Sequence, residues 1–259
     1  GKFGAANNIG TILGPVMVGS LVGINIFNVQ IPEFGLLTPL IVMSFVMAIA
    51  TFLVYLFLPN KPVSLNTAVV REKVVFDRNL KILISIGVII FTAFALVQSI
   101  TAYYVQDRFD VSLDETAQTT ALLLGTMAFM AIVSQLTFVQ KYKGNPLNLI
   151  KFSLPLFILS CLSIIFSPNF LFLYLGMALM GLGMGLASPG YTSAASLNAD
   201  KDNQGAAVGL AMIAPGIGFA LGPFISGFLY SISMNLPFIF ILPLFIILAI
   251  LIKKLEQLI

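Results

Sequence analysis

Residues 209–227 read GLAMIAPGIGFALGPFISG, and residues 1–19 read GKFGAANNIGTILGPVMVG. The two stretches share four glycines and one proline in identical register, 208 residues apart. The matched positions are Gly1, Gly10, Gly14, Pro15 and Gly19 in the first copy and Gly209, Gly218, Gly222, Pro223 and Gly227 in the second. Five matches in register on two apolar stretches indicate a duplicated structural unit.

The shared residues have a clear physical role in helix packing. Glycines four residues apart leave a flat strip on a helix where another backbone can approach closely, and proline removes one N–H and bends the helix. We therefore expect both copies of the pattern to serve as packing surfaces inside membrane helices.

Working outward from the repeat, the chain contains eight runs, uncharged except near their ends, that are long enough to cross a membrane. A bilayer core about 30 Å thick needs about 20 apolar residues in a helix. The predicted spans are Ala5–Ile26, Leu37–Leu58, Leu80–Tyr104, Leu113–Val139, Leu149–Phe166, Phe170–Leu197, Ala206–Tyr230 and Leu236–Ile252. The spacing of Ser112 and Glu115 also predicts a capping box that starts the fourth span.

Composition supports an all-α polytopic membrane protein. Of the 259 residues, 59% are hydrophobic and only 9% are charged, so the apolar surface requires the lipid bilayer as its solvent. The net charge of +3 is therefore no sign of nucleic-acid binding. The chain has one cysteine, Cys161, and no histidine, so we expect no internal disulfide, no metal site and no cofactor.

The distribution of basic residues predicts the orientation. If Gly1 is cytoplasmic, twelve of the thirteen basic residues fall on the cytoplasmic side, which is a strong positive-inside bias. The exception is Arg108, which is accompanied by Asp107, Asp110, Asp114 and Glu115. An even number of spans then places both ends of the chain in the cytoplasm, and we expect a bacterial inner membrane.

Several of these residues resemble a known family. The pattern Gly1-x8-Gly10-x3-Gly14-Pro15 resembles the antiporter motif on the fifth helix of drug/proton antiporters of the major facilitator superfamily. Gln106-Asp107-Arg108-Phe109, Gly181-x-Gly183-x-Gly185 and Ser188-Pro189-Gly190 resemble the second half of that family. Val18 departs from the family pattern, which usually has glycine there.

The resemblance implies that the chain spans the fifth to twelfth helices of a fold that normally has six plus six. Residues 1–58 would be the last two helices of the N-terminal bundle, 59–79 a cytoplasmic linker, and 80–259 the complete C-terminal bundle. The repeat offset predicts about 130 residues before Gly1 and roughly 390 in the whole protein, which we expect to be monomeric.

In this family the central cavity is lined by the first, fourth, seventh and tenth helices, which here implies the spans starting at Leu80 and Phe170. On the first of these, Thr92, Ala95, Ser99 and Ala102 form a small or polar stripe, flanked by Gln98 and Tyr103. On the second, candidate substrate contacts recur every three or four residues; they are Met180, Met184, Ser188, Tyr191 and Thr192. Helix packing is the alternative for each of these side chains.

No ionisable residue lies in the interior of a predicted span, where a charge is costly and usually functional. We therefore expect a coupling carboxylate on the first four helices of the complete protein. Asp107 is the nearest candidate in this chain, and an ion pair with Arg108 is the alternative for it.

The sequence thus predicts a secondary transporter that exports small organic compounds or drugs against proton entry by alternating access. A sugar, amino-acid or other metabolite importer of the same fold is the alternative. A channel is disfavoured because no ring of charges is present, and a membrane enzyme because no clustered catalytic residues are present. The glycine-rich runs at 181–185 and 216–222 lie within long apolar segments, so they do not indicate a nucleotide-binding loop.

Overall fold

The computed structural model describes residues 37–57, 78–197 and 209–258, and within these ranges the chain is helical without strands. Seven of its helices are long and apolar enough to cross a membrane. The elements are α2 (Leu37–Phe57), α3 (Arg78–Phe109), α4 (Leu113–Thr137), the short 3₁₀ helix η1 (Val139–Lys141), α5 (Pro146–Ile165), α6 (Phe170–Leu197), α8 (Ile213–Ile232) and α9 (Leu236–Glu256). The all-α polytopic fold is confirmed.

The predicted first span, Ala5–Ile26, lies outside the described residues, so the eighth helix stays a prediction. Most of the predicted linker, 59–79, lies outside them as well. Its last two residues belong to α3, which begins at Arg78. Hydropathy marks only the lipid-buried part of a helix, and for this reason α3 and α9 extend beyond their predicted spans at their polar ends.

The start of α4 follows the predicted cap. The helix begins at Leu113, and the Ser112 hydroxyl accepts a hydrogen bond from the Glu115 backbone N–H at 3.3 Å. This bond satisfies one of the N–H groups that the first helical turn leaves without an intrahelical partner. A tight turn at Asp110, whose φ is 50°, joins α3 to this cap.

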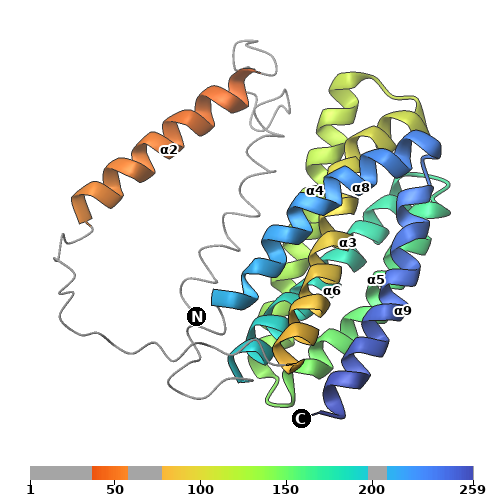
Figure 1. The fold of residues 1–259 in the computed structure, drawn as a ribbon. Helices are drawn as coiled ribbons and strands as arrows, with labels where there is room; N and C mark the ends of the chain where they lie inside the picture. The colour runs from red at the N-terminus through yellow and green to blue at the C-terminus, as the bar shows by residue number, and fades with distance from the viewer. Residues whose placement is uncertain (1–36, 58–77, 198–208, 259) are drawn as a thin grey trace.

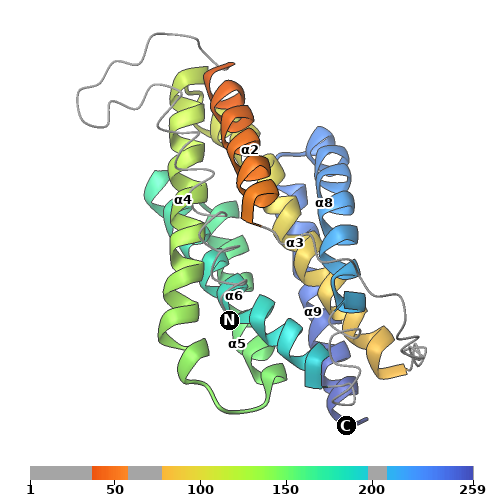
Figure 2. The same ribbon diagram turned by 90° about the vertical axis from the view of Figure 1, so that its left-hand side faces the viewer.

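Helices α3 to α9 run lengthwise beside one another (Figures 1 and 2). The closest pairs are α5 with α6, α3 with α8, and α4 with α6. Residues 91–97 of α3 are buried without interruption, whereas most of α8 and α9 alternates between buried and exposed positions. Helix α3 is therefore an interior helix at its mid-length.

Glycines on two faces of α6 bring it close to two neighbours. A Cβ atom added at Gly181 would lie 2.0 Å from the Met127 carbonyl oxygen, and one at Gly185 would lie 2.4 Å from the Ala131 carbonyl oxygen, both on α4. Gly176, Gly183 and Gly190, seven residues apart, face α5, where added Cβ atoms would meet mainly side chains, such as those of Ile164 and Phe157. The glycine-rich run at 181–185 is thus a packing surface on which backbones approach closely.

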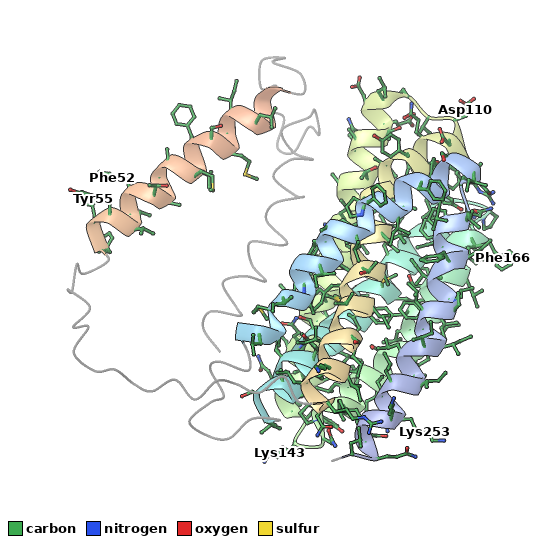
Figure 3. The ribbon with its side chains drawn as sticks, viewed as in Figure 1. Phe52, Tyr55, Asp110, Lys143, Phe166 and Lys253 are labelled. Carbon is green, nitrogen blue, oxygen red and sulfur yellow. The ribbon has the colours of Figure 1, made fainter. Side chains whose placement is uncertain are left out.

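The two ends of the bundle carry opposite charge (Figure 3). Lys143 and Lys253 lie at one end, near the start of α3 with Arg78 and Lys81, and Asp110 lies at the other. Lys151 on α5 forms an ion pair with Glu256 at the end of α9. We call these the basic end and the acidic end.

Candidate functional site

The predicted small stripe on α3 lies against α8. A Cβ atom added at Gly218 would lie 2.6 Å from the Phe91 Cβ atom and 2.7 Å from the Thr92 backbone nitrogen. One added at Gly222 would lie 2.6 Å from the Ala95 Cβ atom. The two glycines of the repeat thus allow the α3 and α8 backbones to approach each other, as their spacing predicts.

The remaining residues of the second repeat copy do not share this contact. Added Cβ atoms at Gly209 and Gly227 would meet no atom of another described residue within 4 Å, and Pro223 is exposed within α8. The first copy, from Gly1 to Gly19, lies outside the described residues. Only the middle of the pattern therefore makes the close contact in the described structure.

A hydrogen bond continues the α3–α8 contact one turn further. The hydroxyls of Ser99 and Ser226 lie 2.7 Å apart, and Ser226 follows Gly222 by four residues. Sequence reasoning identified Ser99 but missed Ser226, although the sequence of Gly218, Gly222 and Ser226 at four-residue intervals carries the signal. Thr92 is also buried in this contact, and its hydroxyl has no hydrogen-bond partner in the ranges that the structure covers.

We predict a measurable coupling between the two serines. Interhelical hydrogen bonds in membranes contribute about 0.6 kcal/mol on average. In a double-mutant cycle with Ser99→Ala and Ser226→Ala, unfolding in mixed detergent should give a coupling free energy of this size, about 0.5–1.5 kcal/mol. Additive single effects would show that the hydroxyls do not interact.

Tyr191 of α6 ties together three helices. Its side chain is fully buried, its ring lies edge-on to Phe91 of α3 with centroids 6.0 Å apart, and it fills the space left by Gly87. Its hydroxyl donates a hydrogen bond to the Ala211 carbonyl oxygen at 2.8 Å. Proline at 215 has no N–H to donate to that carbonyl, so the tyrosine hydroxyl takes the place of the lost helix hydrogen bond.

Removing the Tyr191 hydroxyl, a single oxygen atom, should lower the stability of the protein measurably. Tyr191→Phe keeps the ring packing but leaves a buried carbonyl without a donor, so we expect a loss of about 1–3 kcal/mol in the free energy of unfolding. The change is measured by denaturant unfolding of the purified chain. The matched control is Tyr55→Phe on α2, where the tyrosine is 82% exposed and the substitution should have no effect.

The other predicted cavity residues differ in exposure. Met180 is fully buried in the bundle core. Gln98, Met184, Ser188 and Thr192 are half-buried, and Tyr103 is 63% exposed near the acidic end. The Thr192 hydroxyl is bonded to its own helix, at the Ser188 carbonyl oxygen. Thr92 and Ser99 therefore lie where α3 meets α8, and Tyr191 reaches the Ala211 carbonyl just before α8 begins.

Asp107 and Arg108 have separate partners at the acidic end. The Tyr230 hydroxyl donates a hydrogen bond to a carboxylate oxygen of Asp107 at 2.6 Å. The Arg108 guanidinium donates to the Ser167 carbonyl oxygen at 3.0 Å, in the turn between α5 and α6. The alternative of an Asp107–Arg108 ion pair is wrong for this structure, because α8 supplies the partner of Asp107 and the α5–α6 turn supplies the partner of Arg108.

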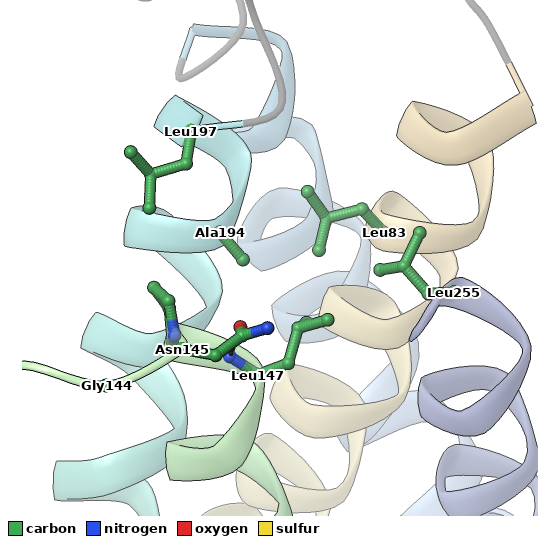
Figure 4. Close-up of a pocket in the computed structure, with 8 residues that line it drawn as sticks. Leu83, Gly144, Asn145, Leu147, Ala194, Leu197 and Leu255 are labelled. Carbon is green, nitrogen blue, oxygen red and sulfur yellow. Dashed lines mark hydrogen bonds between the residues drawn. The ribbon is translucent and has the colours of Figure 1, made fainter. Parts of the chain in front are cut away.

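Two pockets lie toward the basic end. One, of about 280 Å³, is lined by Leu83, Asn145, Leu147, Ala194, Leu197 and Leu255, and Figure 4 shows these side chains arranged around it from α3, α5, α6 and α9. The other, of about 460 Å³, lies over α4, α5 and α6. Neither is lined by a predicted cavity residue. Among the described residues there is no cluster of three metal-ligating side chains.

Part of the helical bundle matches a known protein family. Residues 140–256 match the Major Facilitator Superfamily. The match runs from η1 through α5, α6 and α8 to the end of α9, somewhat less than half of the chain. No curated protein matches the chain. The matched part of the chain is therefore similar to transporters of the major facilitator type, and the seven helices long enough to cross a membrane agree with that similarity.

Proposed function

We propose that this chain belongs to a proton-coupled exporter of small organic compounds, of the drug/proton antiporter kind, working by alternating access. The family match over residues 140–256 carries the transporter part of this proposal. The antiporter part rests on the glycine–proline repeat, whose second copy forms the close α3–α8 contact. An importer of sugars, amino acids or other metabolites with the same fold is the alternative.

The proposed mechanism uses the bundle as a rigid body. Close backbone contacts of α3 with α8, and of α6 with α4 and α5, resist internal deformation, because closely packed helices do not shear easily. Rocking of this bundle against a second one would expose a mid-membrane cavity to each side in turn. The basic end would face the cytoplasm, in keeping with the positive-inside rule.

The cavity wall is proposed to include the half-buried polar and sulfur-containing side chains of α3 and α6. Gln98, Ser188 and Thr192 would supply hydrogen bonds, Met184 and Tyr103 would supply adaptable apolar contact, and Met180, Tyr191, Thr92 and Ser99 would support these two helices from behind. We propose that the proton carrier is a carboxylate on a helix outside this chain, because the described spans have no ionisable group at mid-depth.

The test is transport into everted membrane vesicles from cells that express the intact gene. We expect uptake of a cationic dye when the vesicle interior is acidified, and loss of uptake when a proton ionophore collapses the gradient. The Asp107→Asn variant is the control, and its uptake should equal that of the parent.

Uptake of the dye that ignores the gradient would contradict proton coupling. Gradient-driven uptake of a labelled sugar or amino acid into right-side-out vesicles, without dye export, would support the importer instead. A transporter with neither activity would contradict both assignments of substrate.

A further inference from the structure

The larger pocket is a groove on the outside of the bundle, near the basic end. It has a volume of about 460 Å³, and we call it the α4–α5 groove. Its lining includes Ser134 and Phe138 of the α4 region, Tyr142 after η1, Phe152 and Leu156 of α5, and Leu182 of α6. None of these belongs to the proposed transport cavity.

The lining is almost entirely apolar and open to the surroundings of the bundle. Phe138 is 65% exposed and Phe152 is 56% exposed, and the Phe152 ring meets the Tyr142 ring edge-on with centroids 6.4 Å apart. In a bilayer such a groove borders hydrocarbon, because apolar surface at this depth is not hydrated. Its natural filling is therefore an acyl chain.

One polar atom in the lining has no partner. Ser134 is 1% exposed, and its hydroxyl forms no hydrogen bond within the described part of the chain. A buried hydroxyl without a partner carries a desolvation cost that no hydrogen bond offsets. An acceptor brought by an occupant of the groove would remove that cost.

The segment that carries the lining residue Tyr142 is positively charged. Lys141 and Lys143 flank Tyr142 and are exposed, and no acidic residue occurs between positions 138 and 149. Lys151, on the next turn of α5, is already paired with Glu256. Lys141 and Lys143 are thus the basic residues closest in sequence to the groove lining that have no acidic residue near them in the sequence.

We propose that the α4–α5 groove binds one anionic glycerophospholipid. An acyl chain fills the groove, an ester carbonyl accepts a hydrogen bond from the Ser134 hydroxyl, and the phosphate lies between the ammonium groups of Lys141 and Lys143. Lys141, at the end of η1, follows Ser134 of α4 by seven residues, or roughly 10 Å at the rise of an α-helix, so the hydroxyl lies deeper than the charges. This order matches that of a phospholipid, whose esters lie below its phosphate.

The headgroup part is tested by native mass spectrometry of the purified full chain with added dioleoyl phosphatidylglycerol or dioleoyl phosphatidylcholine. We expect the anionic lipid to bind roughly tenfold more tightly, since each basic residue near the surface favours anionic lipid. Lys141→Gln with Lys143→Gln should abolish the preference. The matched control, Lys253→Gln with Lys254→Gln, removes the same amount of charge from α9 at the same end. It should retain the preference for the anionic lipid.

The groove part is tested by changing its interior. Ser134→Ala should weaken phosphatidylglycerol binding by about two- to tenfold, the value of one hydrogen bond. Leu182→Phe should fill part of the groove and weaken both lipids, whereas Leu159→Phe, at an exposed position of α5 outside the lining, should weaken neither. Circular dichroism and gel filtration confirm that each variant is folded.

Two results would overturn the proposal. One is equal affinity for the two lipids in the parent chain. The other is unchanged phosphatidylglycerol binding in both Ser134→Ala and Leu182→Phe, which would place the lipid elsewhere on the bundle.

Discussion

Gly181→Ala should disrupt the packing of α4 against α6 and destabilise the protein, although it adds only one methyl group. The new Cβ atom would lie 2.0 Å from the Met127 carbonyl oxygen and 2.8 Å from its carbonyl carbon. These are backbone atoms of a packed helix, so no side-chain rotation relieves the overlap and the two helices must move apart. We expect a loss of about 3 kcal/mol or more in the free energy of unfolding, at the upper end of the range for overpacked cores.

The measurement is denaturant unfolding of the purified chain in detergent micelles, followed by far-ultraviolet circular dichroism. The matched control is Gly216→Ala on α8, where an added Cβ atom meets nothing within 4 Å. This control should be neutral or slightly stabilising, because alanine is a better helix former by about 1 kcal/mol. Equal stability of the two variants would show that α4 and α6 are not in close contact at Gly181.

Gly222→Ala should separate α3 from α8 in the same way. The added Cβ atom would lie 2.6 Å from the Ala95 Cβ atom and 2.8 Å from the Leu96 backbone nitrogen. We expect a loss of about 2–3 kcal/mol, since both a side chain and the backbone of α3 stand in its way. Combining it with Ala95→Gly should restore part of that loss, because the nearest of the two obstacles is removed.

The control for this contact is Gly227→Ala, which lies on the same helix and in the same repeat but has open space around it. Its stability should equal that of the parent within about 0.5 kcal/mol, as is usual for surface substitutions. A destabilising Gly227→Ala together with a neutral Gly222→Ala would mean that a different face of α8 meets α3.

The helices themselves were predictable because the bilayer sets their length. Phe170–Leu197 was predicted with the bounds that the structure gives to α6, and Leu113 with its cap at Ser112 was predicted as the start of α4. Both starts follow a short polar segment of the sequence, so hydropathy and the capping pattern are sufficient to place them. Where an apolar run ends more gradually, as on α3, the observed helix extends beyond the predicted span by several residues.

What each side of a helix packs against was less predictable. Periodicity placed Thr92, Ala95 and Ser99 on one stripe of α3, but a small or polar stripe suits a cavity and a helix contact equally well. In the structure this stripe packs against Gly218, Gly222 and Ser226 of α8. Only the identity of the packing partner decides between a cavity wall and a helix contact. The periodicity of a single helix does not reveal that partner.

The role of Tyr191 depends on a break in a different helix. Proline at 215 frees the Ala211 carbonyl, and the tyrosine reaches it from α6 across twenty residues of chain. Proline alone predicts an orphan carbonyl, but not which side chain satisfies it. This contact required the tertiary arrangement of α3, α6 and α8.

The central claim is that the bundle crosses a membrane, with its basic end in the cytoplasm and its acidic end outside. Variants with one added cysteine, Asp110→Cys in the α3–α4 turn and Lys143→Cys in the turn before α5, test it in intact cells with a membrane-impermeant maleimide. The parent chain is the control, because its one cysteine, Cys161, is buried. We predict labelling of Asp110→Cys from outside and of Lys143→Cys only after permeabilisation, whereas the reverse pattern, or equal labelling of both in intact cells, would contradict the account.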